Sequence, residues 1–143
     1  MKNKILNKKN IAKFLQNYRL KRKKIVHCHG VFDLLHLGHF EHFLKAKSFG
    51  DILIVSVTSD RFVNKGPNQP FFSLNERIKA LSHIESIDHI IESNSPDAIE
   101  IIKSIKPDIY CKGKDYQNSK EDLTGKIKKE LDLVKSNNGK IVF

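Results

Sequence analysis

The chain has 143 residues, of which 39% are hydrophobic and 29% charged, and these values suit a single globular domain with one core. No apolar run approaches the ~20 residues that a membrane-spanning helix needs, which argues against an integral membrane protein. We expect a cytoplasmic protein that does not bind membranes. Cys28 and Cys111 both lie in apolar runs, which predicts buried, reduced thiols and fits that compartment.

The net charge of +10 comes from one end of the chain. Residues 1–24 contain ten lysines and arginines and no acidic residue; subtracting these ten from the 26 basic residues leaves 16, against 16 acidic ones. Four apolar residues of this segment have the spacing of one helix face, namely Ile11, Phe14, Leu15 and Tyr18. We therefore expect a basic helical arm over residues 1–24, packed on a domain over residues 25–143. Because no aromatic residues interleave the lysines, nucleic acid is not an expected partner.

Along the rest of the chain, short apolar runs alternate with longer amphipathic segments. The apolar runs predict strands at residues 24–28, 51–57, 88–92, 107–113 and 139–143. The other segments predict helices at residues 37–48, 73–84, 95–105 and 120–136. Ser73 with Glu76 forms a capping-box pattern, and Ser95 followed by Pro96 is typical of a helix start. The alternation predicts an α/β fold, a Rossmann-like doubly wound parallel sheet of about five strands with helices on both faces.

The stretch HGVFDLLHLGH, residues 29–39, carries the strongest chemical signal. His36 falls at the end of a loop and His39 in the first turn of the predicted helix, while Gly38 leaves room for a close approach to the backbone. A helix N-terminus favours phosphate, and two imidazoles there can donate hydrogen bonds to phosphate oxygens. A metal site is not expected, because His27 and His29 share one face of a strand while Cys28 points to the other.

Four ordered stretches resemble one known family. They are GVFDLLHLGH, SVTSDRFVNKG, LNERIKALSHIESIDHII and IKPDIYCKGKDY, and the resemblance covers nearly all of residues 25–143. They are similar to the HxGH nucleotidyltransferases of the cytidylyltransferase-like family. Within it, the heptose-phosphate adenylyltransferase and glycerol-3-phosphate cytidylyltransferase types are the most similar.

The resemblance implies a role for each matching residue. Four residues match catalytic positions, namely His36, His39, Lys65 and Arg77. The two histidines would contact the triphosphate, Lys65 would neutralise phosphate charge, and Arg77 would lie near the acceptor or the triphosphate. The implied nucleotide-binding residues are Gly30, Val31, Phe32, Asp33, Gly38, Lys112, Gly113, Asp115 and Tyr116. Asp33 would fix the loop or the acceptor.

The resemblance implies transfer of CMP or AMP from CTP or ATP to a small phosphorylated sugar or polyol, with release of pyrophosphate. Magnesium would be bound through the triphosphate, without protein ligands of its own. The alternative is a catalytically inactive nucleotide-binding regulatory domain. Relatives also imply a homodimer and a fused kinase domain. The chain ends at Phe143, before a Ser/Thr-rich segment that closes the site in relatives, so we expect a fragment of a longer protein. His29 replaces the asparagine of heptose-type relatives, which leaves the sugar open.

Overall fold

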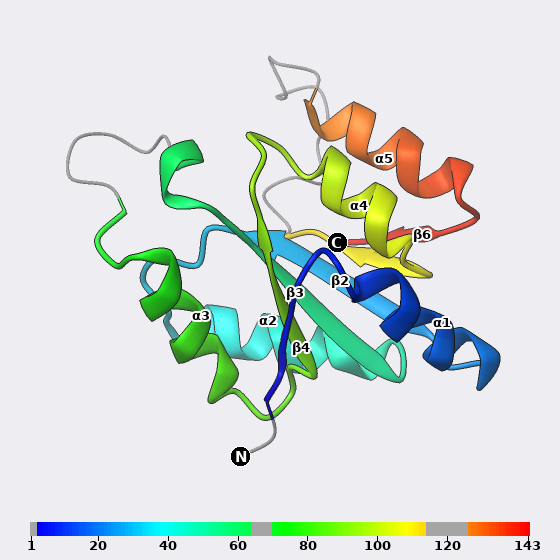
Figure 1. Ribbon diagram of the computed structural model, residues 1–143, viewed down its shortest axis with the longest axis horizontal. Helices are drawn as coiled ribbons and strands as arrows, with labels where there is room; N and C mark the ends of the chain where they lie inside the picture. The colour runs from blue at the N-terminus through cyan, green and yellow to red at the C-terminus, as the bar shows by residue number, and fades with distance from the viewer. Residues whose placement is uncertain (1–2, 64–69, 114–125) are drawn as a thin grey trace.

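A computed structural model describes residues 3–63, 70–113 and 126–143 of the chain. Within these residues the strands are β1 (Ile5–Leu6), β2 (Ile25–Gly30), β3 (Ile52–Thr58), β4 (His89–Ser93), β5 (Ile109–Cys111) and β6 (Lys140–Val142). The helices of the same residues are α1 (Ile11–Leu20), α2 (Leu37–Ser48), α3 (Leu74–Ser82), α4 (Ile99–Ile105) and α5 (Lys126–Ser136), with a 3-10 turn η1 (Asp60–Phe62). Neighbouring strands pair in parallel in the order β1-β4-β3-β2-β5-β6, which places β2 and β3 at the centre (Figure 1).

The predicted Rossmann-like parallel sheet is confirmed, but the described residues form six strands where about five were expected. The additional strand, β1, lies in the N-terminal arm and pairs Ile5 with Ile90 of β4. A strand of two residues is too short to show an alternating pattern in the sequence. Helix α1 follows and packs on the sheet through Ile11 and Leu15, both buried. The arm therefore completes one edge of the sheet.

Each face of the sheet carries a hydrophobic core. One face packs against α2 and α3 through side chains that include Phe43, and the other packs against α1, α4 and α5 through side chains that include Leu15 and Val134. Because β3 is covered on both faces, its sequence is almost continuously apolar. Cys28 and Cys111 are buried free thiols, as predicted. None of the helices in the described residues is long and apolar enough to cross a membrane.

Two helix starts follow the local sequence signals. α2 begins and ends at the predicted residues. α3 begins after Ser73, whose hydroxyl accepts the N–H of Glu76 at 3.3 Å, while the Glu76 carboxylate accepts the N–H of Ser73 at 3.2 Å. This is the predicted capping box. Because each helix follows a strand of the parallel sheet, both begin at its carboxyl edge, where ligands bind in such folds.

The helix after β4 begins later than predicted. α4 starts at Ile99 rather than at residue 95. The Asp97 carboxylate accepts the N–H of Ile99 at 3.0 Å, and the N–H of Ala98 donates to the Glu130 carboxylate of α5 at 3.3 Å. Asp97 and a tertiary contact therefore fix this helix start, and Ser95 does not. The predicted residues 120–125 of the last helix lie outside the described part of the chain.

Candidate active site

The loop after β2 holds an aromatic ring under the predicted site. Phe32 has a φ of 52°, in the left-handed region that a bulky residue rarely adopts. Its ring packs edge-on against His39 and Phe43, with centroids 5.8 and 5.1 Å away. A Cβ on Gly30 would lie 2.8 Å from the Phe32 ring, so a larger residue there would displace it. Gly30 and Phe32 thus shape the approach to the histidines.

The two motif histidines cap the N-terminus of α2 reciprocally. The N–H of Gly38 donates to His36 Nδ1 at 3.0 Å, and the N–H of His36 donates to His39 Nδ1 at 3.2 Å. The two imidazole centroids are 4.1 Å apart. A Cβ on Gly38 would lie 2.7 Å from His36 Cε1, so the glycine provides the space for this ring.

This capping arrangement fixes the tautomers of both imidazoles. Because each Nδ1 accepts a backbone N–H, a neutral His36 or His39 must carry its proton on Nε2. The helix N-terminus adds the partial positive charge of its peptide dipoles. The site therefore combines two imidazole N–H donors with a helix N-terminus, which is suited to phosphate oxygens that gain negative charge.

Arg77 lies beneath the site and joins three loops. Its side chain has no exposed surface. The guanidinium donates to the carbonyls of Val31 and Thr58, each at 2.8 Å, and of Phe72 at 3.0 Å. It also forms an ion pair with Asp60 of η1 at 2.6 Å. This geometry lets Arg77 position the three loops around the site, and its contact with the acceptor or the triphosphate stays a prediction.

Asp33 fixes the segment that precedes α3. Its carboxylate accepts the N–H of Phe71 at 2.7 Å and the N–H of Phe72 at 2.9 Å. Of the two roles that the resemblance implied, the structure displays the fixing of a loop. Together with Arg77, which holds the Phe72 carbonyl, Asp33 ties this segment to the loop that carries the histidine motif.

A polar network crosses the carboxyl ends of β2 and β3. Ser56 Oγ lies 2.7 Å from both His27 Nε2 and His29 Nδ1, and a hydroxyl can donate to only one of them. His27 Nδ1 is buried without a hydrogen-bond partner among the described residues. An unprotonated Nδ1 with an unpaired lone pair costs less free energy there than a protonated Nδ1 with an unpaired N–H. His27 therefore donates to Ser56, Ser56 donates to His29, and the His29 proton sits on Nε2, 3.4 Å from Thr58 Oγ1.

Both histidines of this network are neutral at neutral pH. Burial lowers the pKa of His27 well below its usual value. Burial and the Lys112 charge lower the pKa of His29 to about 3. Lys112 itself is buried and forms an ion pair with Glu130 of α5, at 3.0 Å between Nζ and Oε2. The carboxyl edge of the sheet therefore holds uncharged donors and acceptors next to a paired cation.

These lowered pKa values predict an acid-sensitive fold. Above about pH 6.5 the two imidazoles are neutral in both the folded and the unfolded chain and do not affect stability. As the pH falls from about 6.5 toward 3, only the unfolded chain takes up these protons, so the free energy of unfolding decreases, by at most about 1.4 kcal/mol per pH unit for each histidine. Urea unfolding between pH 7 and 4 measures this slope. His29→Asn should flatten it and His83→Asn, at an exposed position, should not; equal slopes in both variants would contradict the prediction.

The structure brings together some of the predicted site residues and leaves others apart. The loop after β2, the start of α2 and the Arg77 side chain form one contiguous group. Lys112 is engaged with Glu130, and Gly113 is the last residue described before residue 126, with no atom of the described residues within 4 Å of its Cβ position. Three predicted residues lie outside the described part of the chain, namely Lys65, Asp115 and Tyr116.

Sequence reasoning missed three residues of this region. Asp60 lies in the stretch SVTSDRFVNKG, from which only Lys65 was selected, and its carboxylate pairs with Arg77. Ser56 joins the two strand histidines, and Glu130 neutralises Lys112 from 18 positions away. The alternation of β2 and β3 could have indicated Ser56, since it faces the same side as the histidines. Nothing local to Glu130 indicates its partner.

The central strand β2 of the parallel sheet leads through a glycine-bearing loop to a helix start that suits phosphate. This arrangement defines a Rossmann-like nucleotide-binding protein. The chain belongs to the cytidylyltransferase-like family, which matches residues 27–142. This confirms the resemblance found in the sequence.

Curated relatives are similar over most of this chain. It is 37% identical over 132 residues to the bifunctional protein HldE of Wolinella succinogenes, covering 91% of this chain and 28% of that protein. It is 41% identical over 120 residues to the bifunctional protein HldE of Nitratiruptor sp., covering 82% and 26%. The chain therefore spans little more than a quarter of the length of these relatives.

Solved structures show the same architecture. The lipopolysaccharide core biosynthesis protein of Thermoplasma volcanium has a TM-score of 0.68 and 32% identity, with 84% of this chain and 94% of that chain covered. The pantoate-beta-alanine ligase of Francisella tularensis also has a TM-score of 0.68, with 22% identity over 99% of this chain and 66% of that chain. The second likeness shows the fold alone.

Proposed function

We propose that this chain transfers CMP or AMP from CTP or ATP to a small phosphorylated sugar or polyol, heptose-phosphate-like or glycerol-phosphate-like, and releases pyrophosphate. The observation that carries the proposal is the reciprocal cap of His36 and His39, which leaves an Nε2 proton on each neutral ring at a helix N-terminus. The family and the HldE relatives support nucleotidyl transfer to a sugar phosphate. They do not favour the alternative of an inactive regulatory domain.

In the proposed reaction, an oxygen of the acceptor phosphate attacks the α-phosphorus of the nucleotide. A new phosphorus–oxygen bond forms while the bond to the bridging oxygen of the pyrophosphate breaks. The histidine donors and the helix N-terminus would stabilise the charge that builds on the α-phosphate oxygens. Because the attacking oxygen is already anionic, the reaction needs no strong general base. This agrees with a histidine-based site.

Magnesium, bound through the triphosphate oxygens, would offset the charge of the leaving pyrophosphate. The described residues include no cluster of three or more His, Cys, Asp or Glu side chains arranged to hold a metal ion. The imidazole N–H donors of His36 and His39 suit phosphate oxygens rather than a cation. The donor set therefore fits an ion that arrives with the nucleotide. Lys65 would add positive charge near the acceptor or the pyrophosphate.

The remaining expectations concern the whole protein. The relatives are named bifunctional and this chain matches about 28% of them, which supports a fused kinase domain in the full-length protein. The two buried free thiols support the expectation of a reducing, cytoplasmic location. No observation supports nucleic acid as a partner of the basic arm.

Titration calorimetry of CTP and of ATP, each with magnesium, tests the proposed function. We expect saturable binding of one nucleotide and loss of that binding in the double variant His36→Ala/His39→Ala. Pyrophosphate release should then appear with one member of a panel of sugar and polyol phosphates. Binding that survives in the double variant would place the nucleotide elsewhere. Nucleotide binding without pyrophosphate release in the presence of any acceptor would favour the alternative, a catalytically inactive regulatory domain.

A further inference from the structure

Two cysteines face each other on strands that lead into the candidate active site. Cys28 of β2 and Cys111 of β5 are directly paired residues of neighbouring parallel strands. Both side chains belong to the same core cluster, so they lie on the same face of the sheet. The Cys28 thiol forms a hydrogen bond with the sulfur of Cys111. The chain contains no other cysteine, and the proposed reaction uses neither thiol.

The surroundings of the pair distinguish its two thiols. The hydrogen bond from Cys28 and the charge of Lys45 lower the pKa of Cys111, although burial opposes them. The same hydrogen bond and burial raise the pKa of Cys28 well above its usual value. Cys111 is therefore the first of the two to become a thiolate. His42 Nε2 lies 3.7 Å from Cys28 Sγ, where a neutral imidazole can take up the proton of that thiol.

The spacing of the strands permits a disulfide bond between these residues. Neighbouring strands lie about 4.8 Å apart, within the range of roughly 4.4–6.8 Å between the Cα atoms of disulfides. The Cβ atoms of a disulfide are about 3.8 Å apart, so the bond would draw β2 and β5 together by about 1 Å. Strain of this kind makes a disulfide easier to reduce, which suits a reversible bond.

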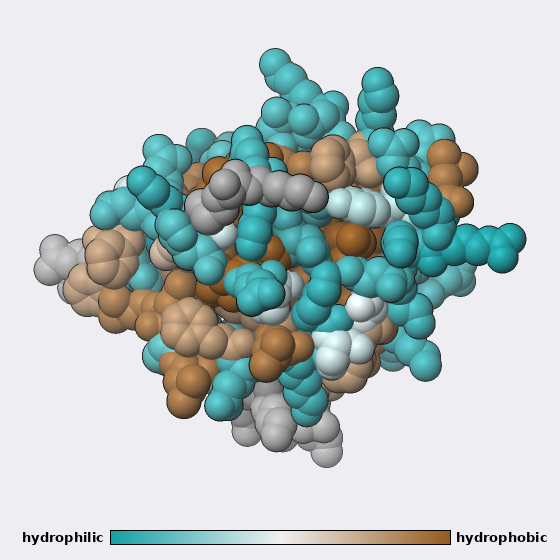
Figure 2. Space-filling view, turned by 90° about the horizontal axis from the view of Figure 1, so that it is seen from below, coloured by the Kyte–Doolittle hydropathy of each residue, from teal (hydrophilic) through white to brown (hydrophobic). Residues whose placement is uncertain are grey.

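Only a small oxidant can reach the pair. Hydrophilic and hydrophobic side chains together cover the face of the molecule shown in Figure 2. Both thiols lie in the core, with 1% of Cys28 and 5% of Cys111 exposed. Cys111 is the last residue of the three-residue strand β5, where local opening costs little free energy. Hydrogen peroxide is little larger than water and is therefore the oxidant that fits.

We propose that Cys28 and Cys111 form a peroxide-reactive dithiol site that closes reversibly to a disulfide. The Cys111 thiolate attacks one oxygen of hydrogen peroxide; a sulfur–oxygen bond forms, the oxygen–oxygen bond breaks, and hydroxide leaves and takes up a proton. The Cys28 sulfur then attacks the resulting sulfenic sulfur, and a sulfur–sulfur bond replaces the sulfur–oxygen bond. The second hydroxide leaves with the Cys28 proton, passed on by His42. Two thiols and one peroxide thus give one disulfide and two water molecules.

The consequence for activity rests on the proposed function. Cys28 lies two residues before Gly30, and Cys111 directly precedes Lys112. A shift of about 1 Å in these strand ends would displace the loop that carries the histidine motif, and a misplacement of that size reduces turnover by about 100-fold. Dithiothreitol should restore the turnover. The double variant Cys28→Ser/Cys111→Ser should keep its turnover after peroxide treatment, and an undiminished turnover of the disulfide form would contradict this consequence.

Mass spectrometry of the peroxide-treated chain tests the dithiol site without any activity, so its failure is distinguishable from a failure of the proposed function. The chain is treated with a small excess of hydrogen peroxide, quenched with catalase, unfolded and alkylated with iodoacetamide. We expect a monomer that has lost two hydrogen atoms and takes no alkyl group, and two alkyl groups after reduction with dithiothreitol. Two alkylated thiols without reduction, a disulfide-linked dimer, or oxygen added to either cysteine would overturn the proposal.

Two serine variants test the order of the two steps. Cys28→Ser keeps a hydrogen-bond donor to Cys111 but cannot form the disulfide, so peroxide should leave a sulfenic acid that dimedone labels. The matched variant Cys111→Ser should leave Cys28 as an unlabelled thiol, because the remaining thiol is buried and protonated. Unchanged melting temperatures would show that both variants fold. Labelling of Cys111→Ser but not of Cys28→Ser would overturn the assignment of Cys111 as the attacking thiol.

Discussion

Replacing His39 by alanine is expected to lower turnover by at least about 100-fold, the usual cost of losing one preorganised donor to a charged transition state. The structure attributes the loss to Nε2, since Nδ1 is occupied by the N–H of His36. The same substitution removes one acceptor from the helix cap and should reduce stability by about 1 kcal/mol. The rate of pyrophosphate release and the melting temperature together separate these two effects.

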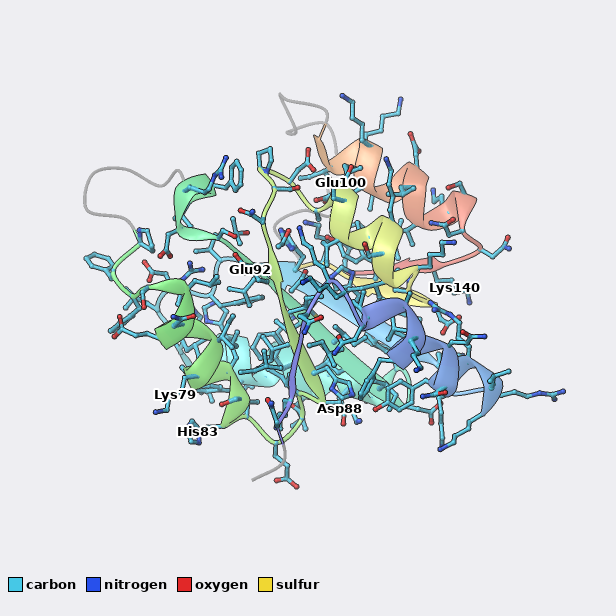
Figure 3. The ribbon with its side chains drawn as sticks, viewed as in Figure 1. Lys79, His83, Asp88, Glu92, Glu100 and Lys140 are labelled. Atoms are coloured by element: carbon cyan, nitrogen blue, oxygen red, sulfur yellow. The ribbon has the colours of Figure 1, made fainter. Side chains whose placement is uncertain are left out.

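Two amide substitutions separate the two functions of the His39 imidazole, which are the helix cap at Nδ1 and the donor at Nε2. The Oδ1 atom of His39→Asn lies near the position of Nδ1, so this variant should recover the cap and the melting temperature but not the turnover. The amide N–H of His39→Gln reaches toward the position of Nε2 and should recover part of the turnover. His83→Ala, at the exposed end of α3 (Figure 3), is the control for loss of an unrelated histidine. If His39→Asn were fully active, the cap alone would matter and the proposed catalytic donor would be wrong.

Arg77→Met is expected to produce the largest loss of stability among single substitutions in the site. The methionine fills much of the same volume but leaves the carbonyls of Val31, Thr58 and Phe72 without their donor. Unpaired buried carbonyls cost about 1–3 kcal/mol each, and partial hydration reduces the sum, so we expect a loss of about 3–5 kcal/mol in the free energy of unfolding. Asp60 is half exposed and contributes little to this loss.

Urea unfolding of the variant at pH 7 gives the comparison. Lys79→Met on the exposed side of the same helix (Figure 3) is the matched control and should change the free energy of unfolding by less than about 0.5 kcal/mol. Arg77→Lys should fall between the two, because one ammonium group cannot reach the same carbonyls as a planar guanidinium. A stability loss in Arg77→Met as small as that of Lys79→Met would show that the three loops are held by other contacts.

Local signals predicted the parts of the fold that depend on neighbouring residues. The limits of α2 and the capping box of Ser73 and Glu76 are set within a few positions of sequence, and both were predicted correctly. The predicted start of α4 was wrong because the observed start depends partly on Glu130, which accepts the N–H of Ala98 from 32 positions away. Strand β1 was missed because its two residues become a strand only through pairing with β4.

The same distinction applies to the candidate site. The histidine motif and its phosphate-suited helix start are local, so the sequence was sufficient to find them. Whether a buried cation meets a ligand or a protein partner is decided by the fold. The hydrogen bond from Arg77 to the carbonyl of Val31, 46 positions away, has no local signal in the sequence. The carboxylate that α5 supplies to Lys112 has none either.

The pairing of β1 with β4 has a consequence for how the protein folds. Ile5 pairs with Ile90, so during synthesis strand β1 waits for a partner made 85 residues later. A contact of such long sequence separation has a high loop-closure cost and forms late. Until then the outer edge of β4 exposes unpaired backbone groups, a template for pairing with other chains. The lysine-rich segment around β1 would keep such nascent chains apart by mutual repulsion until the edge is closed.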